Sequence, residues 1–139
     1  MLLAFGFGVF SVFPAGISSV MGSQMFDVSG SFINTGLYAF LVVALSEEFA
    51  KFFFLRYILF KREEFNEPLD GVVYAVMIGM GFAAFENILY VSTGGVGVAL
   101  LRMVTAIPAH AIFAVVMGYY VGLAKFDLTH RSELIRKGL

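Results

Sequence analysis

The chain has 139 residues, of which 60% are hydrophobic and 14% charged, and its mean hydropathy is +0.89. Soluble domains carry about 25% charged residues, so this composition predicts a membrane protein of one domain without a separate soluble module. The net charge of −1 argues against nucleic-acid binding, and the absence of cysteine excludes disulfides, a thiol nucleophile and cysteine-ligated metals.

Four apolar segments are each long enough to cross the hydrocarbon core as a helix, which takes about 20 residues. Only helices and closed barrels satisfy the backbone in lipid, and the segments lack the alternation of barrel strands, so we expect an all-α polytopic membrane helix bundle. A polar loop at 22–31, a charged loop at 61–69 and a short turn at 92–95 separate the segments. The prediction is a single transmembrane domain, 1–139, with spans at about 2–21, 32–60, 70–91 and 96–126 and a tail at 127–139.

The basic residues predict how the chain is oriented in the cell membrane. The first and third connections contain no Lys or Arg, whereas the second connection and the C-terminal region contain several. Because cytoplasmic loops are enriched in Lys and Arg, both termini are expected in the cytoplasm. The residues behind this inference are Lys61, Arg62, Lys125, Arg131, Arg136 and Lys137.

Two adjacent carboxylates, Glu47 and Glu48, lie in the middle of the second apolar segment, with Lys51 following. A charged residue at the centre of a membrane helix costs about 2.5 to 3.5 kcal/mol even on lenient scales, so such residues are functional candidates. Glu47 and Lys51 have the i, i+4 spacing of an ion pair, which would leave Glu48 freer to carry a proton. Two close carboxylates split their titrations, and this split suits general acid–base chemistry.

The third and fourth segments add further polar residues at membrane depth. Small residues recur every four positions along the third segment and predict a closely packed neighbouring helix, with Glu86 beside this stripe. In the fourth segment, Pro108 precedes His110 by two residues and should kink the helix or open its hydrogen bonding there. Counting along straight helices at about 1.5 Å per residue places Glu47 and His110 at similar depth. The stripe consists of Gly71, Ala75, Gly79 and Ala83, followed by Asn87.

Two common hydrolase motifs do not occur in the sequence. There is no H-E-x-x-H motif of zinc proteases and no G-x-S-x-G motif of serine hydrolases. The candidate chemistry is therefore that of glutamate with histidine. Arg102 either belongs to this site or extends its side chain to the outer membrane surface.

Together these residues resemble the PrsW family of intramembrane proteases, within the wider group that includes the CAAX endopeptidases. The resemblance covers about residues 1–125 and implies cleavage of a membrane-protein substrate, in the best-known case an anti-sigma factor. It also implies that one of Glu47 and Glu48 is the general base, and that His110 binds the attacking water or stabilises the oxyanion. The implied catalytic residues are Glu47, Glu48, Glu86 and His110, supported by Lys51, Asn87, Tyr90 and Arg102. The motifs that carry the resemblance are Glu47-Glu48-x-x-Lys51, Asp70-Gly71, Gly81-Phe82-x-x-Phe85-Glu86-Asn87-x-x-Tyr90, Arg102, His110-Ala111-x-Phe113 and Gly118.

Members of this group are often described as metalloproteases. Three glutamates and a histidine can ligate zinc, but no ligand spacing of a known zinc motif is present. We therefore expect a glutamate mechanism without a cofactor, with zinc as the alternative.

Two further function classes fit the sequence less well. One is a small proton- or cation-coupled membrane transporter, since carboxylates within a membrane can bind protons or cations. The other is a non-catalytic membrane scaffold of the same fold.

Overall fold

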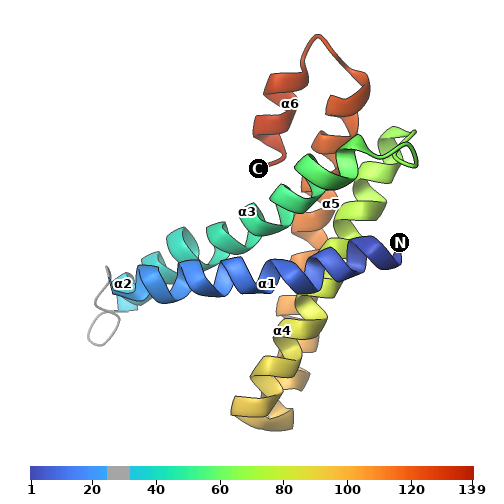
Figure 1. Cartoon of the computed structure of the whole chain (residues 1–139). Helices are drawn as coiled ribbons and strands as arrows, with labels where there is room; N and C mark the ends of the chain where they lie inside the picture. Colours follow the sequence, from blue (N-terminus) through green and yellow to red (C-terminus); the bar gives the residue numbers. More distant parts are fainter. Residues whose placement is uncertain (25–31) are drawn as a thin grey trace.

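The computed structural model describes residues 1–24 and 32–139, and the predicted all-α class is confirmed because every described element is a helix (Figure 1). Of the predicted loop at 22–31, residues 25–31 lie outside the described part. Within the described residues, three helices are long and apolar enough to cross a membrane, where the sequence predicted four spans. These are α1 (Leu2–Ser23), α4 (Pro68–Val104) and α5 (Ala106–Phe126).

The segment predicted as the second span, 32–60, is helical but divided into pieces of different helix type. Two π-helical stretches, in which the backbone bonds i to i+5, flank the α-helix that carries Glu47 and Glu48. None of the pieces alone is long enough to cross a membrane, so the span as a unit stays a prediction. Such π-helical turns occur frequently at functional sites. In chain order the pieces are α2 (Phe32–Tyr38), η1 (Ala39–Ala44), α3 (Leu45–Phe53), η2 (Phe54–Ile58) and η3 (Leu59–Lys61).

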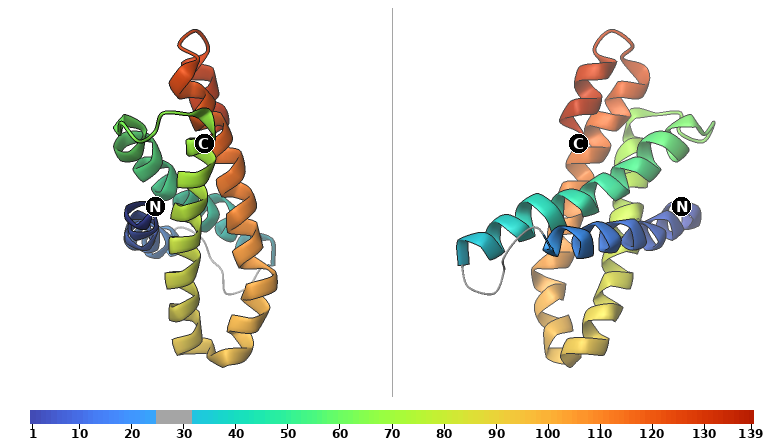
Figure 2. Two further views of the ribbon diagram at one scale, coloured as in Figure 1. Left: turned by 90° about the vertical axis from the view of Figure 1, so that its right-hand side faces the viewer. Right: turned by 60° about the vertical axis from the view of Figure 1, so that its left-hand side comes forward.

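Helix α4 contains a sharp reversal at Gly95, within the stretch predicted as a turn. Gly95 has φ 77° and ψ −180°, a conformation that side chains rarely permit. Figure 2 shows that the chain turns back near the yellow end of α4 and then runs beside the earlier part of α4 as the orange α5. A second break follows at Thr105, one turn before Pro108. Pro108 has no N–H to donate to the carbonyl of Val104, which explains the break predicted near His110.

The α4–α5 hairpin packs through small residues. A Cβ atom on Gly118 of α5 would overlap the carbonyl oxygen of Gly71 on α4, and one on Gly79 would lie 3.1 Å from the Cβ of Ala114. The small-residue stripe therefore faces α5 over this stretch, as its spacing predicts. Close contact at a glycine also joins α1 to α4, because a Cβ on Gly8 would overlap the carbonyl oxygen of Ile78.

Helices α1 and α2–α3 run side by side and cross the α4–α5 hairpin (Figures 1 and 2). Many large apolar side chains remain exposed on the outer faces of these helices. Apolar exposure on this scale suits contact with lipid. The short α6 (Arg131–Lys137) folds back on α5, where Arg131 donates hydrogen bonds to the carbonyls of Ala124 and Lys125.

Candidate active site

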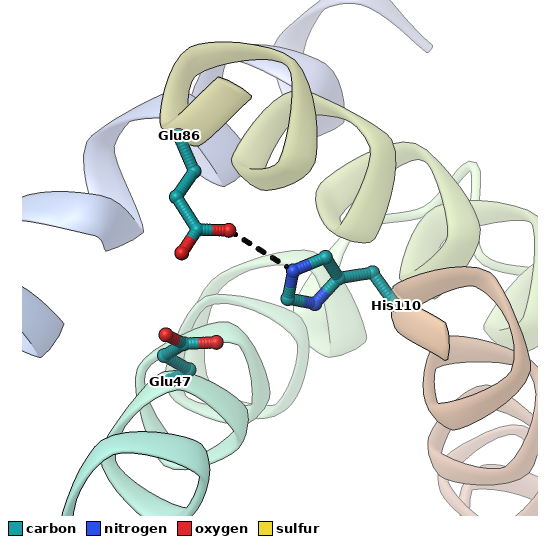
Figure 3. Close-up of side chains that lie close together, drawn as sticks. All are labelled: Glu47, Glu86 and His110. Atoms are coloured by element: carbon teal, nitrogen blue, oxygen red, sulfur yellow. Dashed lines mark hydrogen bonds and ion pairs between the residues drawn. The ribbon is translucent and has the colours of Figure 1, made fainter. Parts of the chain in front are cut away.

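Three helices each contribute one titratable side chain to a single cluster. Glu47 comes from α3, Glu86 from α4 and His110 from α5, and the three side chains point toward one another (Figure 3). One potential ligand atom of each lies within 4.8 Å of the others. The structure thus brings together residues far apart in the sequence that were expected at similar depth.

Lys51 pairs with Glu48 and not with Glu47, which corrects the pairing expected from the i, i+4 spacing. Its Nζ donates to Glu48 Oε1 at 2.6 Å. Lys51 is buried at 2% exposure beside His110 and Phe82, and Glu48 Oε1 lies 4.0 Å from His110 Nδ1 on the same side. Among the described residues, Glu47 has no hydrogen bond or ion pair and is the unpartnered carboxylate of the cluster.

His110 is held at both ring nitrogens. Lys51 Nζ lies 2.9 Å from Nδ1, and Glu86 Oε2 lies 3.1 Å from Nε2. A lysine ammonium can only donate, so Nδ1 accepts and the proton of the neutral ring belongs on Nε2, where it is donated to Glu86. The two contacts therefore select one tautomer and one ring orientation.

Glu86 is held in turn by Arg102, across the reversal at Gly95. Arg102 Nη2 donates to Glu86 Oε2 at 2.5 Å, and the guanidinium lies 3.9 Å from the centre of the Tyr90 ring. The Arg102 side chain is only 15% exposed, so it belongs to the site and does not extend to the membrane surface. Arg102 therefore contacts both Glu86 and Tyr90, and the supporting roles that the resemblance implies for Arg102 and Tyr90 stay predictions.

Asn87 is an expected supporting residue whose contacts do not show what it does in the site. Its Oδ1 is buried and has no hydrogen-bond partner among the described residues. The same holds for Glu48 Oε2 and Arg102 Nε. Buried polar atoms without partners are few in native proteins and often mark places where water or a ligand binds.

Phe82 is a site residue that the sequence analysis did not single out for the site. Its ring centre lies 4.2 Å from Lys51 Nζ and 5.3 Å from the ring centre of His110. Its position four residues before Glu86 was the available signal, because residues at i and i+4 share a helix face. Phe82 therefore supports the buried ammonium by a cation–π contact.

The cluster suits a metal ion by donor type but not by its hydrogen bonds. Two carboxylates and one imidazole match the three protein ligands of catalytic zinc sites. A metal on His110 Nε2 would move the ring proton to Nδ1, where it would face the donor-only ammonium of Lys51. With Lys51 in this position the residues do not fit a metal ion.

The whole chain, residues 1–139, matches the family described as "PrsW family intramembrane metalloprotease". The chain belongs to the PrsW family. A "Protease PrsW" of Geobacillus kaustophilus is 40% identical over 132 residues, covering 94% of this chain and 56% of the relative. The "Protease PrsW" of Bacillus subtilis is 35% identical over 127 residues, covering 91% of this chain and 56% of the relative.

This PrsW-family chain spans little more than half the length of these curated relatives. No solved structure matches it. The functional interpretation of the cluster of Glu47, Glu86 and His110 therefore rests on its own geometry.

Proposed function

We propose that this chain is an intramembrane endopeptidase that uses Glu47 as the general base. The observation that carries the proposal is the contrast between the two adjacent glutamates. Glu48 is engaged by Lys51, whereas Glu47 is free of partners among the described residues and faces Glu86 and His110 (Figure 3). A positioned carboxylate of this kind is what general-base catalysis requires.

In this mechanism a water molecule lies between Glu47 and His110 and attacks the carbonyl carbon of the substrate peptide bond. Glu47 takes a proton from the water, and the carbonyl oxygen becomes an oxyanion. Collapse of the tetrahedral intermediate breaks the carbon–nitrogen bond, and Glu47 delivers its proton to the leaving amine. The atoms and charges balance without a cofactor.

The remaining groups of the site orient the His110 ring and stabilise the negative charges of the site. Glu86 and Lys51 hold the His110 ring in one orientation beside Glu47. In the reaction the oxyanion displaces Glu86 as the acceptor of the His110 Nε2–H. The two cations, Lys51 and Arg102, offset the carboxylates in a region shielded from water. Preorganised donors and charges of this kind are most effective at low dielectric.

The substrate that fits such a site is a membrane protein with a span beside the cluster, of the anti-sigma-factor type. The orientation with both termini in the cytoplasm belongs to the same proposal. Glu86 lies on the α4 segment that leads to the reversal at Gly95, which this orientation places on the outer side. Cleavage would then fall toward the outer half of the membrane.

The test is cleavage of a single-span reporter by the purified chain in lipid vesicles. We expect wild type to cleave, and Glu47→Gln to lose about 100-fold or more of the rate while remaining folded by circular dichroism. Exposed Glu63, changed to Gln, is the matched control, since it lies in the charged loop outside the site. We expect a chelator to leave activity unchanged.

Two outcomes would contradict the proposal. Activity that is lost with chelator and restored by zinc would make the cluster a metal site. A folded wild type that cleaves none of several reporters would favour the scaffold or transporter interpretations.

A further inference from the structure

A groove of about 340 Å³ runs between the η1–α3 segment and α5 and reaches the candidate active site. It shares His110 with the triangle of Glu47, Glu86 and His110, but Glu47 and Glu86 do not line it. Glu48 and His110 form its polar part, and apolar side chains, among them that of the C-terminal Leu139, form the rest. The residues used below are Phe40, Ala44 and Glu48 on one side and Ala109, His110 and Phe113 on the other.

The groove is open because its walls carry small residues where the two helices face each other. Ala44 and Ala109 leave room that larger side chains would fill, while Phe40 and Phe113 are exposed. An occupant that enters from the lipid side therefore meets apolar atoms first. Mostly apolar walls with a few convergent polar groups are typical of ligand sites.

The polar end of the groove distinguishes a peptide from a lipid chain as its occupant. Glu48 uses Oε1 to accept from Lys51, and its Oε2 is buried without a partner among the described residues. A buried acceptor without a partner is destabilising, so a bound group that brings a donor is favoured. A peptide backbone offers an N–H next to an apolar side chain, whereas an acyl chain offers no donor.

We propose that this groove binds the apolar side chain of the substrate residue beside the cleaved bond, while Glu48 accepts a hydrogen bond from the substrate backbone. The inference rests on the proposed peptidase function and divides the work of the two glutamates. Glu47 acts on water, and Glu48 binds substrate. Ala109 then sets the size of side chain that is accepted.

The first experiment measures side-chain preference. After the cleaved bond of a single-span peptide has been mapped by mass spectrometry, the residues on either side are changed between Leu and Ala. We expect wild type to prefer Leu at one of these positions. Ala109→Phe, which fills the groove, should shift the Leu-to-Ala ratio of kcat/KM about 10-fold or more toward Ala.

Ile112→Phe is the matched control, since it adds an aromatic ring to an exposed position of the same helix outside the groove. A ratio that Ala109→Phe leaves unchanged, in a variant that still cleaves, would overturn the inference. So would an equal shift in both variants. A ratio is insensitive to the fraction of folded enzyme, so partial misfolding does not imitate the effect.

The second experiment does not depend on cleavage. A photoreactive amino acid replaces either Phe40 or its neighbour Leu41 in vesicles of phosphatidylcholine and phosphatidylglycerol. Phe40 lines the proposed groove, whereas Leu41 lines a different apolar groove, of about 830 Å³, between α1 and α3. We expect the peptide to be labelled from position 40 and far less from position 41.

The two experiments separate the failure of the inference from the failure of the proposed function. If wild type cleaves nothing, the peptidase proposal fails and the labelling alone decides about the groove. Labelling of lipid only, or equal peptide labelling from both positions, would overturn the groove as a peptide site. Peptide labelling confined to position 40 would support it.

Discussion

At the residue scale, adjacent glutamates have different surroundings. Glu48 has an ammonium at 2.6 Å, whereas Glu47 lies beside the carboxylate of Glu86 and the ring of His110 and forms no ion pair among the described residues. Adjacent residues on a helix lie about 100° apart around its axis, so they face different neighbours. Identical side chains can therefore perform different tasks.

The two carboxamide variants should consequently differ in kinetics. We expect Glu47→Gln to lower kcat by about 100-fold or more, because the base is removed. Glu48→Gln should mainly raise KM, because a donor-only NH2 group replaces one of the two carboxylate oxygens that accept from Lys51 and from the substrate. Steady-state rates on one reporter peptide, at matched protein folding, make the comparison. An equal loss of kcat in both variants would contradict the assignment.

Lys51 connects the two halves of the site. Lys51→Met should destabilise the protein by about 3 to 5 kcal/mol, because it leaves a partly buried carboxylate and His110 Nδ1 without their donor. The double variant Lys51→Met with Glu48→Gln should regain part of the stability but no activity, because the His110 ring remains unclamped. Thermal unfolding in detergent and peptide cleavage measure the two effects. Recovery of activity in the double variant would argue against a role for Lys51 in orienting His110.

At the scale of elements, the close contact of α4 with α5 places His110 against the rest of the site. Gly118→Ala should cost about 1–3 kcal/mol, because the added methyl group overlaps the Gly71 carbonyl and the helices must separate. Gly16→Ala is the control, since a Cβ there meets nothing within 4 Å. Unfolding in detergent should distinguish them. Equal stability of the two variants would show that the helices are not in this contact.

The reversal within α4 is a second element that positions the site. Gly95→Ala should cost about 1–3 kcal/mol, since φ 77° with ψ −180° suits only glycine, and it should weaken the contact of Arg102 with Glu86. Gly97→Ala lacks this strain and is the matched control. Stability and cleavage rate are measured for both variants. Unaltered values for Gly95→Ala would mean that the turn adopts another conformation.

At the scale of the whole molecule, we predict an orientation in the membrane with both termini in the cytoplasm. Because the chain contains no cysteine, single cysteines can be labelled without background. Thr93→Cys, beside the reversal, should react with an impermeant maleimide in intact cells. Glu64→Cys, in the basic connection, should react only after the cells are opened. The reverse pattern would contradict the orientation with cytoplasmic termini.

Much of the architecture was predictable because it depends on local composition and spacing. The apolar segments predicted membrane helices, the small-residue stripe predicted its tight packing, and Pro108 predicted the break near His110. The division of the 32–60 segment by π-helical turns was not predicted. Such turns are rare, and no residue type in the segment marks them.

The sequence by itself determined that this chain is an all-α membrane protein of the PrsW family, and it supplied the candidates Glu47, Glu86 and His110 that the structure brings together. Only the tertiary structure decided that Lys51 pairs with Glu48, that His110 is clamped between Lys51 and Glu86, and that a groove opens beside Glu48. The physical reason is that spacing along one helix gives the direction of a side chain, whereas its partner depends on what the neighbouring helices place there. Here His110 and Phe82, on α5 and α4, form the surroundings in which Lys51 is buried, and Glu47 is left without an ion pair in the part of the chain that the structure describes.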